Sequence, residues 1–205
     1  MHVLGYFIQP DAVALRAFLD RQRSDRVRRV AEMCDRLTAL GCQIDVAPIL
    51  AAAAGGRSVG RPQIAEALVD AGYVQTQDEA FARFLDYRGA AYVPRFGASP
   101  AEVVTIIHDA GGIASLAHPG ANALDHLIAP LAAAGLDAIE AGHSDHDAAT
   151  EARYRALAAE LGLLVTGGSD FHGAAGHRIS RLGAVTLPAA DFEKLSTAAD
   201  RRRAH

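Results

Sequence analysis

The sequence predicts an α/β protein in which a helical subdomain interrupts a sheet of parallel strands covered by helices. From residue 113 onward, short apolar runs alternate with stretches of helical periodicity, an order typical of parallel strands with covering helices. Residues 11–90 instead carry apolar positions at helical spacing only. The chain has 205 residues, half of them hydrophobic, which suffices for one domain with a subdomain.

The amino-terminal half begins with a strand and continues as helices. Residues 2–8 form an apolar run that predicts a strand, and Pro10 ends it. Helical spacing then predicts a long helix over 11–40, with Gly41 as its cap. Ser99, Pro100 and Glu102 have the order of a capped helix start, as Thr76 and Glu79 do. Further helices are expected at 45–54, 60–71, 77–86 and 100–110.

The carboxyl-terminal half carries the βα alternation. Strands are expected at 113–117, 137–141, 163–166 and 182–187. Helices are expected at 122–134, 147–161 and 189–199, with a frayed tail from Arg201. We therefore divide the chain into a strand of the main domain (1–10), a helical insertion (11–95) and the rest of the main domain (96–200).

Composition excludes several classes of protein. The net charge of −4 gives no general attraction to nucleic acid or acidic membranes, and we expect no stable nucleic-acid complex. No apolar run reaches the ~18–20 residues of a membrane span, so no membrane partner is expected. Cys34 and Cys42 form no disulfide framework or zinc knuckle, which favours a reducing cytoplasm.

The segment Gly167–Gly173 carries the strongest chemical signal. It follows the apolar run 161–166 and contains Asp170 and His172, which can face the same way because they are two residues apart in extended chain. A second strand-like run ends at His118. Together these side chains predict a site for Mn²⁺, Fe²⁺ or Zn²⁺ at the carboxyl ends of the strands. The alternative is that Asp170 caps a turn and His118 bonds a backbone carbonyl.

Other residues are candidates for substrate binding. His143 follows a third strand directly, whereas His146 is expected to start the next helix. Arg61 lies at a helix start, a location that favours anions, and is either a phosphate ligand or an internal ion-pair partner. The arginines between 21 and 29 are most simply a solvated helix face, with a phosphate-facing role as the alternative. Phe171 replaces the last glycine of a nucleophile elbow, which disfavours a serine hydrolase.

These motifs resemble the PHP (polymerase and histidinol phosphatase) family, in its branch of bacterial phosphoesterases related to nucleoside 3′,5′-bisphosphate phosphatases and 5′–3′ exonucleases. The resemblance covers nearly the whole chain in order. The matching segments are His2–Tyr6, Gly60–Pro62, Ala110–Gly112, Leu116–Pro119, Gly135–Glu140 and Thr166–Gly173.

The resemblance implies part of a distorted TIM-like (β/α)7 barrel with a helical insertion. It implies up to three divalent ions at the strands' carboxyl ends, most simply Mn²⁺, with Zn²⁺, Fe²⁺ or Mg²⁺ as alternatives. By position, His2, His118, Asp170 and His172 match metal ligands, and Asp170 and His172 also match catalytic positions. Arg61 and His143 would bind the substrate phosphate.

Two departures from the family pattern affect this interpretation. Gln63 stands where the family usually has a histidine after Gly-Arg-Pro, and an amide cannot act as a proton donor near neutrality. The family's His-x-His pair, its further Asp/His pair and its bridging Glu do not precede His2. We therefore expect a truncated gene model, with these motifs encoded upstream of Met1, and poor hydrolysis by the 205-residue form.

The expected activity is hydrolysis of phosphate esters by metal-activated water. The expected substrate is a phosphorylated small molecule, a nucleotide or a short oligonucleotide. Two alternatives stay open: a catalytically inactive remnant or binding module of the same fold, and an amidohydrolase-type metal hydrolase.

Overall fold

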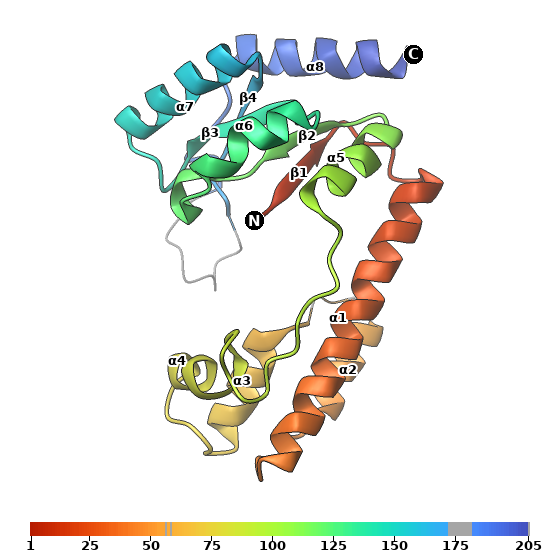
Figure 1. Ribbon diagram of the computed structural model, residues 1–205, viewed down its shortest axis with the longest axis vertical. Coiled ribbons are helices and arrows are strands. Elements are labelled where there is room, and N and C mark those ends of the chain that lie inside the picture. The colour runs from red at the N-terminus through yellow and green to blue at the C-terminus, as the bar shows by residue number, and fades with distance from the viewer. Residues whose placement is uncertain (56, 58, 172–181, 205) are drawn as a thin grey trace. The chain divides into compact units, whose positions relative to one another are not determined.

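The computed structural model describes residues 1–55, 57, 59–171 and 182–204. They divide into two compact units, Met1–Arg16 with Ala98–His205, and Ala17–Gly97. Each unit is described by itself below, and Figure 1 labels their elements. Among the described residues, no helix is both long and apolar enough to cross a membrane.

The first unit is built on a four-stranded sheet with the order β1-β2-β3-β4. Its strands are β1 (Val3–Tyr6), β2 (Ile113–Leu116), β3 (Ala138–His143) and β4 (Leu164–Gly168). β2, β3 and β4 are parallel, as the βα alternation predicts, whereas β1 pairs antiparallel with β2. The predicted α/β class is confirmed.

Helices cover both faces of this sheet, because successive strand residues point to opposite faces and apolar residues occur on both. Ala114, Leu116 and Ile139 point to a core shared with helices α5 (Pro100–Asp109), α6 (Asp125–Ala133) and α7 (Ala148–Leu161). Ile113 and Ala138, one residue earlier on their strands, pack with helix α8 (Ala189–Arg203) on the other face. The short 3₁₀ helix η2 (Gly120–Asn122) precedes α6.

The second unit is helical and has a core of its own. Its elements are α1 (Val13–Ala39), which begins in the first unit, α2 (Ala47–Ala54), α3 (Arg61–Asp70), α4 (Gln77–Ala80) and the π-helical turn η1 (Phe81–Leu85). The fully buried Val30, Leu37, Ile64, Leu68 and Leu85 form the centre of its core. Cys34 and Cys42 are free, buried thiols of the same core.

Two expectations at the carboxyl terminus are wrong. The predicted strand over 182–187 does not form in its described residues, because Gly183 adopts a left-handed turn and Leu182 is exposed. The tail is not frayed from Arg201, because α8 continues to Arg203. Arg202 fixes this end of the helix through Nη2, which lies 2.6 Å from the Oδ1 atom of Asp137.

Candidate functional site

Three candidate residues lie at the carboxyl ends of the parallel strands. His118 follows β2 by two residues, His143 is the last residue of β3, and Asp170 follows β4 by two residues. Because β2, β3 and β4 are parallel and adjacent, these three ends meet at one edge of the sheet. The sheet order agrees with the expectation for His118 and Asp170, and it brings His143 to the same edge. His172, the third residue of that expectation, lies outside the described residues.

His2 reaches the same edge by a different route from the one expected. It precedes β1 and so lies at the start of a strand, not at a carboxyl end. Because β1 runs antiparallel to β2, its start lies beside the end of β2, and the backbone N–H of Ala117 donates to the His2 carbonyl at 3.1 Å. The His2 Nδ1 atom consequently lies 3.3 Å from His118 Nε2.

The cluster continues from His118 to the other two candidates. The rings of His118 and His143 have centroids 5.3 Å apart. The Nε2 atom of His143 lies 3.7 Å from the Asp170 Oδ2 atom. Ser144 donates its hydroxyl proton to the Ser169 carbonyl at 2.7 Å, which ties together the loops that follow β3 and β4. His2, His118, His143 and Asp170 thus form one group of side chains.

A backbone hydrogen bond determines which ring nitrogen of His143 can act as a donor. Its Nδ1 atom accepts a hydrogen bond from the backbone N–H of Asp145 at 3.1 Å, so the neutral ring carries its proton on Nε2. The side chain is fully buried, and Nε2 has no hydrogen-bond partner among the described residues. Burial lowers the pKa of this imidazole, which favours the neutral form. The arrangement leaves an N–H donor aimed into the group.

Glu140 is a further member of the group to which sequence reasoning assigned no role. Its carboxylate accepts the backbone N–H of His118 at 2.8 Å. Burial raises the pKa of Glu140 to about 7, against the lowering effect of that hydrogen bond, and the charge of Asp170 raises it further. The available signal was an acidic residue inside the otherwise apolar run 138–141.

Neighbouring strands supply more buried polar groups on the face that carries Glu140. Ser115 and Thr166 are fully buried, and their hydroxyl oxygens lie 2.8 Å apart. Thr166 is paired with Glu140 in the register of β3 and β4. Burial also raises the pKa of Tyr6, which the Thr166 side chain opposes by a hydrogen bond. This face is therefore apolar under α8 and becomes polar toward the edge that holds the histidines.

The backbone at two of the candidates has an uncommon conformation. His118 has φ +32° and Asp170 has φ +50°, both in the left-handed region that most side chains avoid. Such backbone persists only where surrounding contacts hold it, and it concentrates at functional sites. At His118 the holding contact is the hydrogen bond to Glu140.

The remaining predicted residues are not part of this group. Arg61 belongs to the helical unit, where its Nη1 atom donates to the Leu85 carbonyl at 3.2 Å and lies 3.6 Å from Asp86. Gln63 closes the start of α3 by accepting the backbone N–H of Gly60 at 2.8 Å. His172 lies outside the described residues.

The donor types suit a divalent ion, since imidazole and carboxylate groups are ordinary ligands of Mn²⁺, Fe²⁺ and Zn²⁺. Two ring nitrogens facing each other at 3.3 Å and the buried, unpartnered Nε2 atom of His143 fit a polar centre. Among the described residues, however, no group of three or more His, Cys, Asp or Glu side chains is arranged to hold a metal ion. The described residues thus fit a metal ion in their chemistry and do not by themselves form a complete set of ligands.

Comparison with known proteins assigns the family. No family model matches the chain. A phosphoribosyl 1,2-cyclic phosphate 1,2-diphosphodiesterase from Eggerthella lenta is 30% identical over 184 residues, which are 89% of this chain and 70% of that protein. This chain belongs to the PHP family of phosphoesterases. The predicted enzyme class, hydrolases of phosphate esters, is confirmed at the level of that family.

Two other relatives support the assignment to the PHP family. A 3′,5′-nucleoside bisphosphate phosphatase from Chromobacterium violaceum is 30% identical over 177 residues, 84% of this chain and 62% of that protein. The 5′-3′ exoribonuclease Rnm of Salmonella typhimurium is 30% identical over 180 residues, 84% of this chain and 60% of that protein. The chain thus spans less than two thirds of these two relatives.

Two solved structures resemble this chain. A protein from Bifidobacterium adolescentis described as a metal-dependent phosphoesterase has a TM-score of 0.75 at 30% identity, over 96% of this chain and 70% of its own. An amidohydrolase from Chromobacterium violaceum, solved with bound sulfate and no metal, has a TM-score of 0.69 at 27% identity, over 98% of this chain and 71% of its own.

Proposed function

We propose that this chain hydrolyses phosphate esters of nucleotides or short oligonucleotides with the help of divalent metal ions. Mn²⁺ is the ion we propose first, and the cytoplasm is the proposed location. The observation that carries the proposal is the convergence of His2, His118, His143 and Asp170 at one edge of the sheet. The relatives supply the substrate class, since their names include a phosphodiesterase, a bisphosphate phosphatase and an exoribonuclease.

The proposed roles follow from the chemistry of each side chain. His2, His118, Asp170 and His172 would hold the metal. A divalent ion polarises phosphoryl oxygens and lowers the pKa of a water molecule, which supplies a nucleophile near neutral pH.

The His143 Nε2–H donates to a phosphoryl oxygen of the substrate, because its tautomer is fixed by the Asp145 N–H on the opposite side of the ring. Glu140 is a positioning residue that holds the His118 backbone. Arg61, in the helical unit, would bind a phosphate group.

Hydrolysis of an aryl phosphate and of a nucleoside 3′,5′-bisphosphate, with and without Mn²⁺, tests the proposal. We expect the 205-residue form to turn over slowly, with turnover that depends on metal and that chelation abolishes. Asp170→Asn should lower it by about a hundredfold or more, because each ion stabilises several kcal/mol of developing charge. His118→Ala should behave alike. His126→Ala removes an exposed histidine of the same unit and should leave turnover unchanged. Metal-independent turnover, or full activity of Asp170→Asn, would contradict the proposal.

The amidohydrolase alternative rests on the structural neighbour of that name. Amide substrates assayed beside the phosphate esters separate the two hydrolases. The inactive-module alternative predicts at most one bound metal equivalent and no turnover on either substrate, which metal titration of the chelator-treated protein measures.

A further inference from the structure

The arginines that the sequence concentrates between residues 21 and 29 divide into two groups. Arg23 and Arg28 form ion pairs with acidic residues of their own helix, at 3.0 Å from Asp20 and 2.8 Å from Asp25. Arg26 and Arg29 line a cavity of about 280 Å³ within the helical unit. A solvated helix face therefore accounts for only part of the run.

This cavity is lined by four guanidinium groups. Arg61 and Arg95 join Arg26 and Arg29, and Tyr92 contributes the only aromatic ring among the described residues of the lining. No carboxylate belongs to that described lining. A protein normally balances or separates such charges, because like charges repel strongly where water is partly excluded.

Two of the guanidinium groups, those of Arg29 and Arg95, are held by neutral oxygens, which orient them without cancelling their charge. Arg61 lies 3.6 Å from the Asp86 carboxylate. Arg29 donates from Nε to the Val93 carbonyl at 3.1 Å, which leaves both terminal nitrogens available on the other side of the group. Arg95 donates from Nη2 to the Gln22 side-chain oxygen at 2.9 Å. Fixed guanidinium groups of this kind are suited to the bidentate recognition of phosphate.

Electrostatics within the cavity agree with an anionic ligand. The pKa of Arg29 is lowered, first by burial and then by the charges of Arg61 and Arg95, against the opposing effect of Asp25 and Tyr92. An anion among these groups would remove that repulsion.

A second cavity adjoins the first and is also basic. It measures about 210 Å³ and shares Arg26 and Val59 with the first cavity. Arg57 and Arg23 complete its charged lining, and Arg23 is the one paired with Asp20. Two adjoining basic cavities provide places for two neighbouring anionic groups, which a single phosphate would not occupy.

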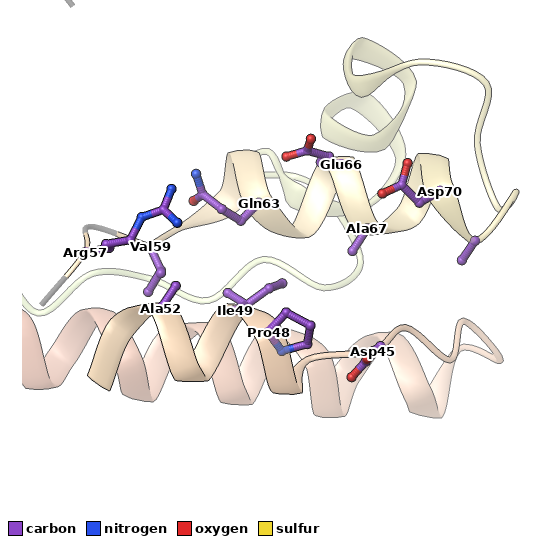
Figure 2. A pocket seen from close by; sticks show the side chains of 11 residues that line it. Asp45, Pro48, Ile49, Ala52, Arg57, Val59, Gln63, Glu66, Ala67 and Asp70 are labelled. Carbon is purple, nitrogen blue, oxygen red and sulfur yellow. The ribbon is translucent and has the colours of Figure 1, made fainter. Parts of the chain in front are cut away.

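Another cavity of the helical unit has the opposite character. It measures about 500 Å³ and lies between α2 and α3, where Figure 2 shows Pro48, Ile49 and Ala52 on the side of α2 that faces α3. Its described lining includes the carboxylates of Asp45, Glu66 and Asp70 and only one arginine, Arg57. Phosphate would be repelled there, so within this unit the charge pattern selects the arginine-lined cavities.

We propose that the two arginine-lined cavities bind successive phosphate groups of a single-stranded oligonucleotide, with Tyr92 as a surface on which a base can stack. The inference rests on the proposed phosphoester hydrolysis and names the form of its substrate. Basic grooves with an aromatic ring are the usual means of holding single strands without reading their sequence. Arg26, Arg29 and Arg95 are the residues that this inference adds to Arg61.

Fluorescence anisotropy of a labelled hexanucleotide on the chelator-treated protein measures binding without hydrolysis. Inorganic phosphate, a nucleoside 3′,5′-bisphosphate and a hexanucleotide with an uncharged methylphosphonate backbone are the competitors. We expect the charged hexanucleotide to compete best and the uncharged one not at all. The logarithm of affinity should fall linearly with the logarithm of salt concentration. Equal competition by inorganic phosphate and the charged hexanucleotide would overturn the two-cavity inference.

Arg29→Gln and Arg95→Gln are the variants that test the cavity. Each should weaken hexanucleotide binding by about tenfold to a hundredfold, since a charge-assisted hydrogen bond contributes ~1.5–3 kcal/mol. Each should also reduce the salt slope by about 0.7. Arg21→Gln makes the same charge change on α1 outside both cavities and should leave affinity nearly unchanged. Equal losses in all three variants would show general charge attraction and overturn the inference.

Hydrolysis of a small aryl phosphate separates this inference from the proposed function. Arg29→Gln and Arg95→Gln should keep wild-type turnover of the aryl phosphate with Mn²⁺, because this small substrate carries a single phosphate group. Circular dichroism should show an unchanged fold. Arginine-dependent hexanucleotide binding without any turnover would refute the proposed function and leave the binding site standing. Turnover with hexanucleotide binding that is indifferent to Arg29 and Arg95 would refute the binding site alone.

Discussion

At the residue scale, the chemistry of the histidine group depends on which ring nitrogen carries the proton. His143 accepts at Nδ1 from the Asp145 N–H, so it donates from Nε2. His146 has the opposite arrangement, because its Nδ1 lies 2.8 Å from the Ala141 carbonyl and must donate to it. Two rings whose centroids are 5.3 Å apart therefore hold opposite tautomers. Backbone groups of β3 and of the loop that follows it set both.

These tautomers can be observed directly. We expect nitrogen-15 NMR of the chelator-treated protein to show His143 protonated at Nε2 and His146 protonated at Nδ1, since each backbone partner allows only that form. Exposed His126 serves as the reference for a ring without such constraint. A His143 ring protonated at Nδ1 would remove the donor that we assign to the substrate phosphate.

Glu140 allows a second prediction at this scale. Glu140→Ala should lower the free energy of unfolding by about 1–3 kcal/mol, because the His118 N–H loses its buried acceptor. Glu140→Gln keeps an acceptor of the same shape and should cost clearly less. Urea unfolding of both variants measures the difference, with exposed Glu193→Gln as the control. Equal losses for Ala and Gln would show that the carboxylate charge, not the hydrogen bond, matters there.

At the element scale, local signals predicted most of the structure and long-range contacts account for the rest. The capped start of α5 was readable because Ser99 and Glu102 complete their box within four residues. β2, β3 and β4 were readable because each is an apolar run between polar segments. The antiparallel pairing of β1, which decides the position of His2, depends on residues more than a hundred positions away. No local pattern encodes it.

The length of α8 has the same kind of cause. Asp137, just before β3, accepts from the Ala114 N–H at 2.7 Å and lies 2.8 Å from His108 Nε2. Arg202 contacts the same carboxylate from α8. A run of arginines looks like a frayed tail in the sequence, but contacts with the distant residues Asp137, Gly112 and Phe7 hold this end of the helix.

Substitutions at this carboxylate test the explanation. Arg202→Ala should lower the free energy of unfolding by about 1–3 kcal/mol, because it removes a charge-assisted bond to a mostly buried carboxylate. Asp137→Ala should cost more, since it leaves several donors without their acceptor. Arg201→Ala makes the same change at an exposed neighbour and should cost little. Thermal unfolding ranks the three, and a loss at Arg201 equal to that at Arg202 would contradict the assignment.

At the scale of the whole molecule, the chain combines two separately packed bodies. The core of the helical unit contains only residues between Val27 and Val93, and both cores of the sheet unit lie outside that span. The histidine group belongs to the sheet unit and the arginine-lined cavities to the helical unit. The proposed hydrolysis and the proposed binding of substrate phosphates therefore belong to separately packed parts of one chain.

Separate cores predict separate responses to core substitutions. Leu68 is fully buried in the helical unit and Leu116 in the sheet unit, and truncating either to alanine should cost about 2–5 kcal/mol within its own unit. Native-state hydrogen exchange followed by mass spectrometry locates the effect. Leu68→Ala should speed exchange across residues 17–97 and leave β2, β3 and β4 protected, because the described core of the sheet unit contains no residue of that span. Leu116→Ala should do the reverse. Equally faster exchange in both units with either variant would show that the chain unfolds as one cooperative unit. The proposal that the two units have separate roles would then have no support from independent stability.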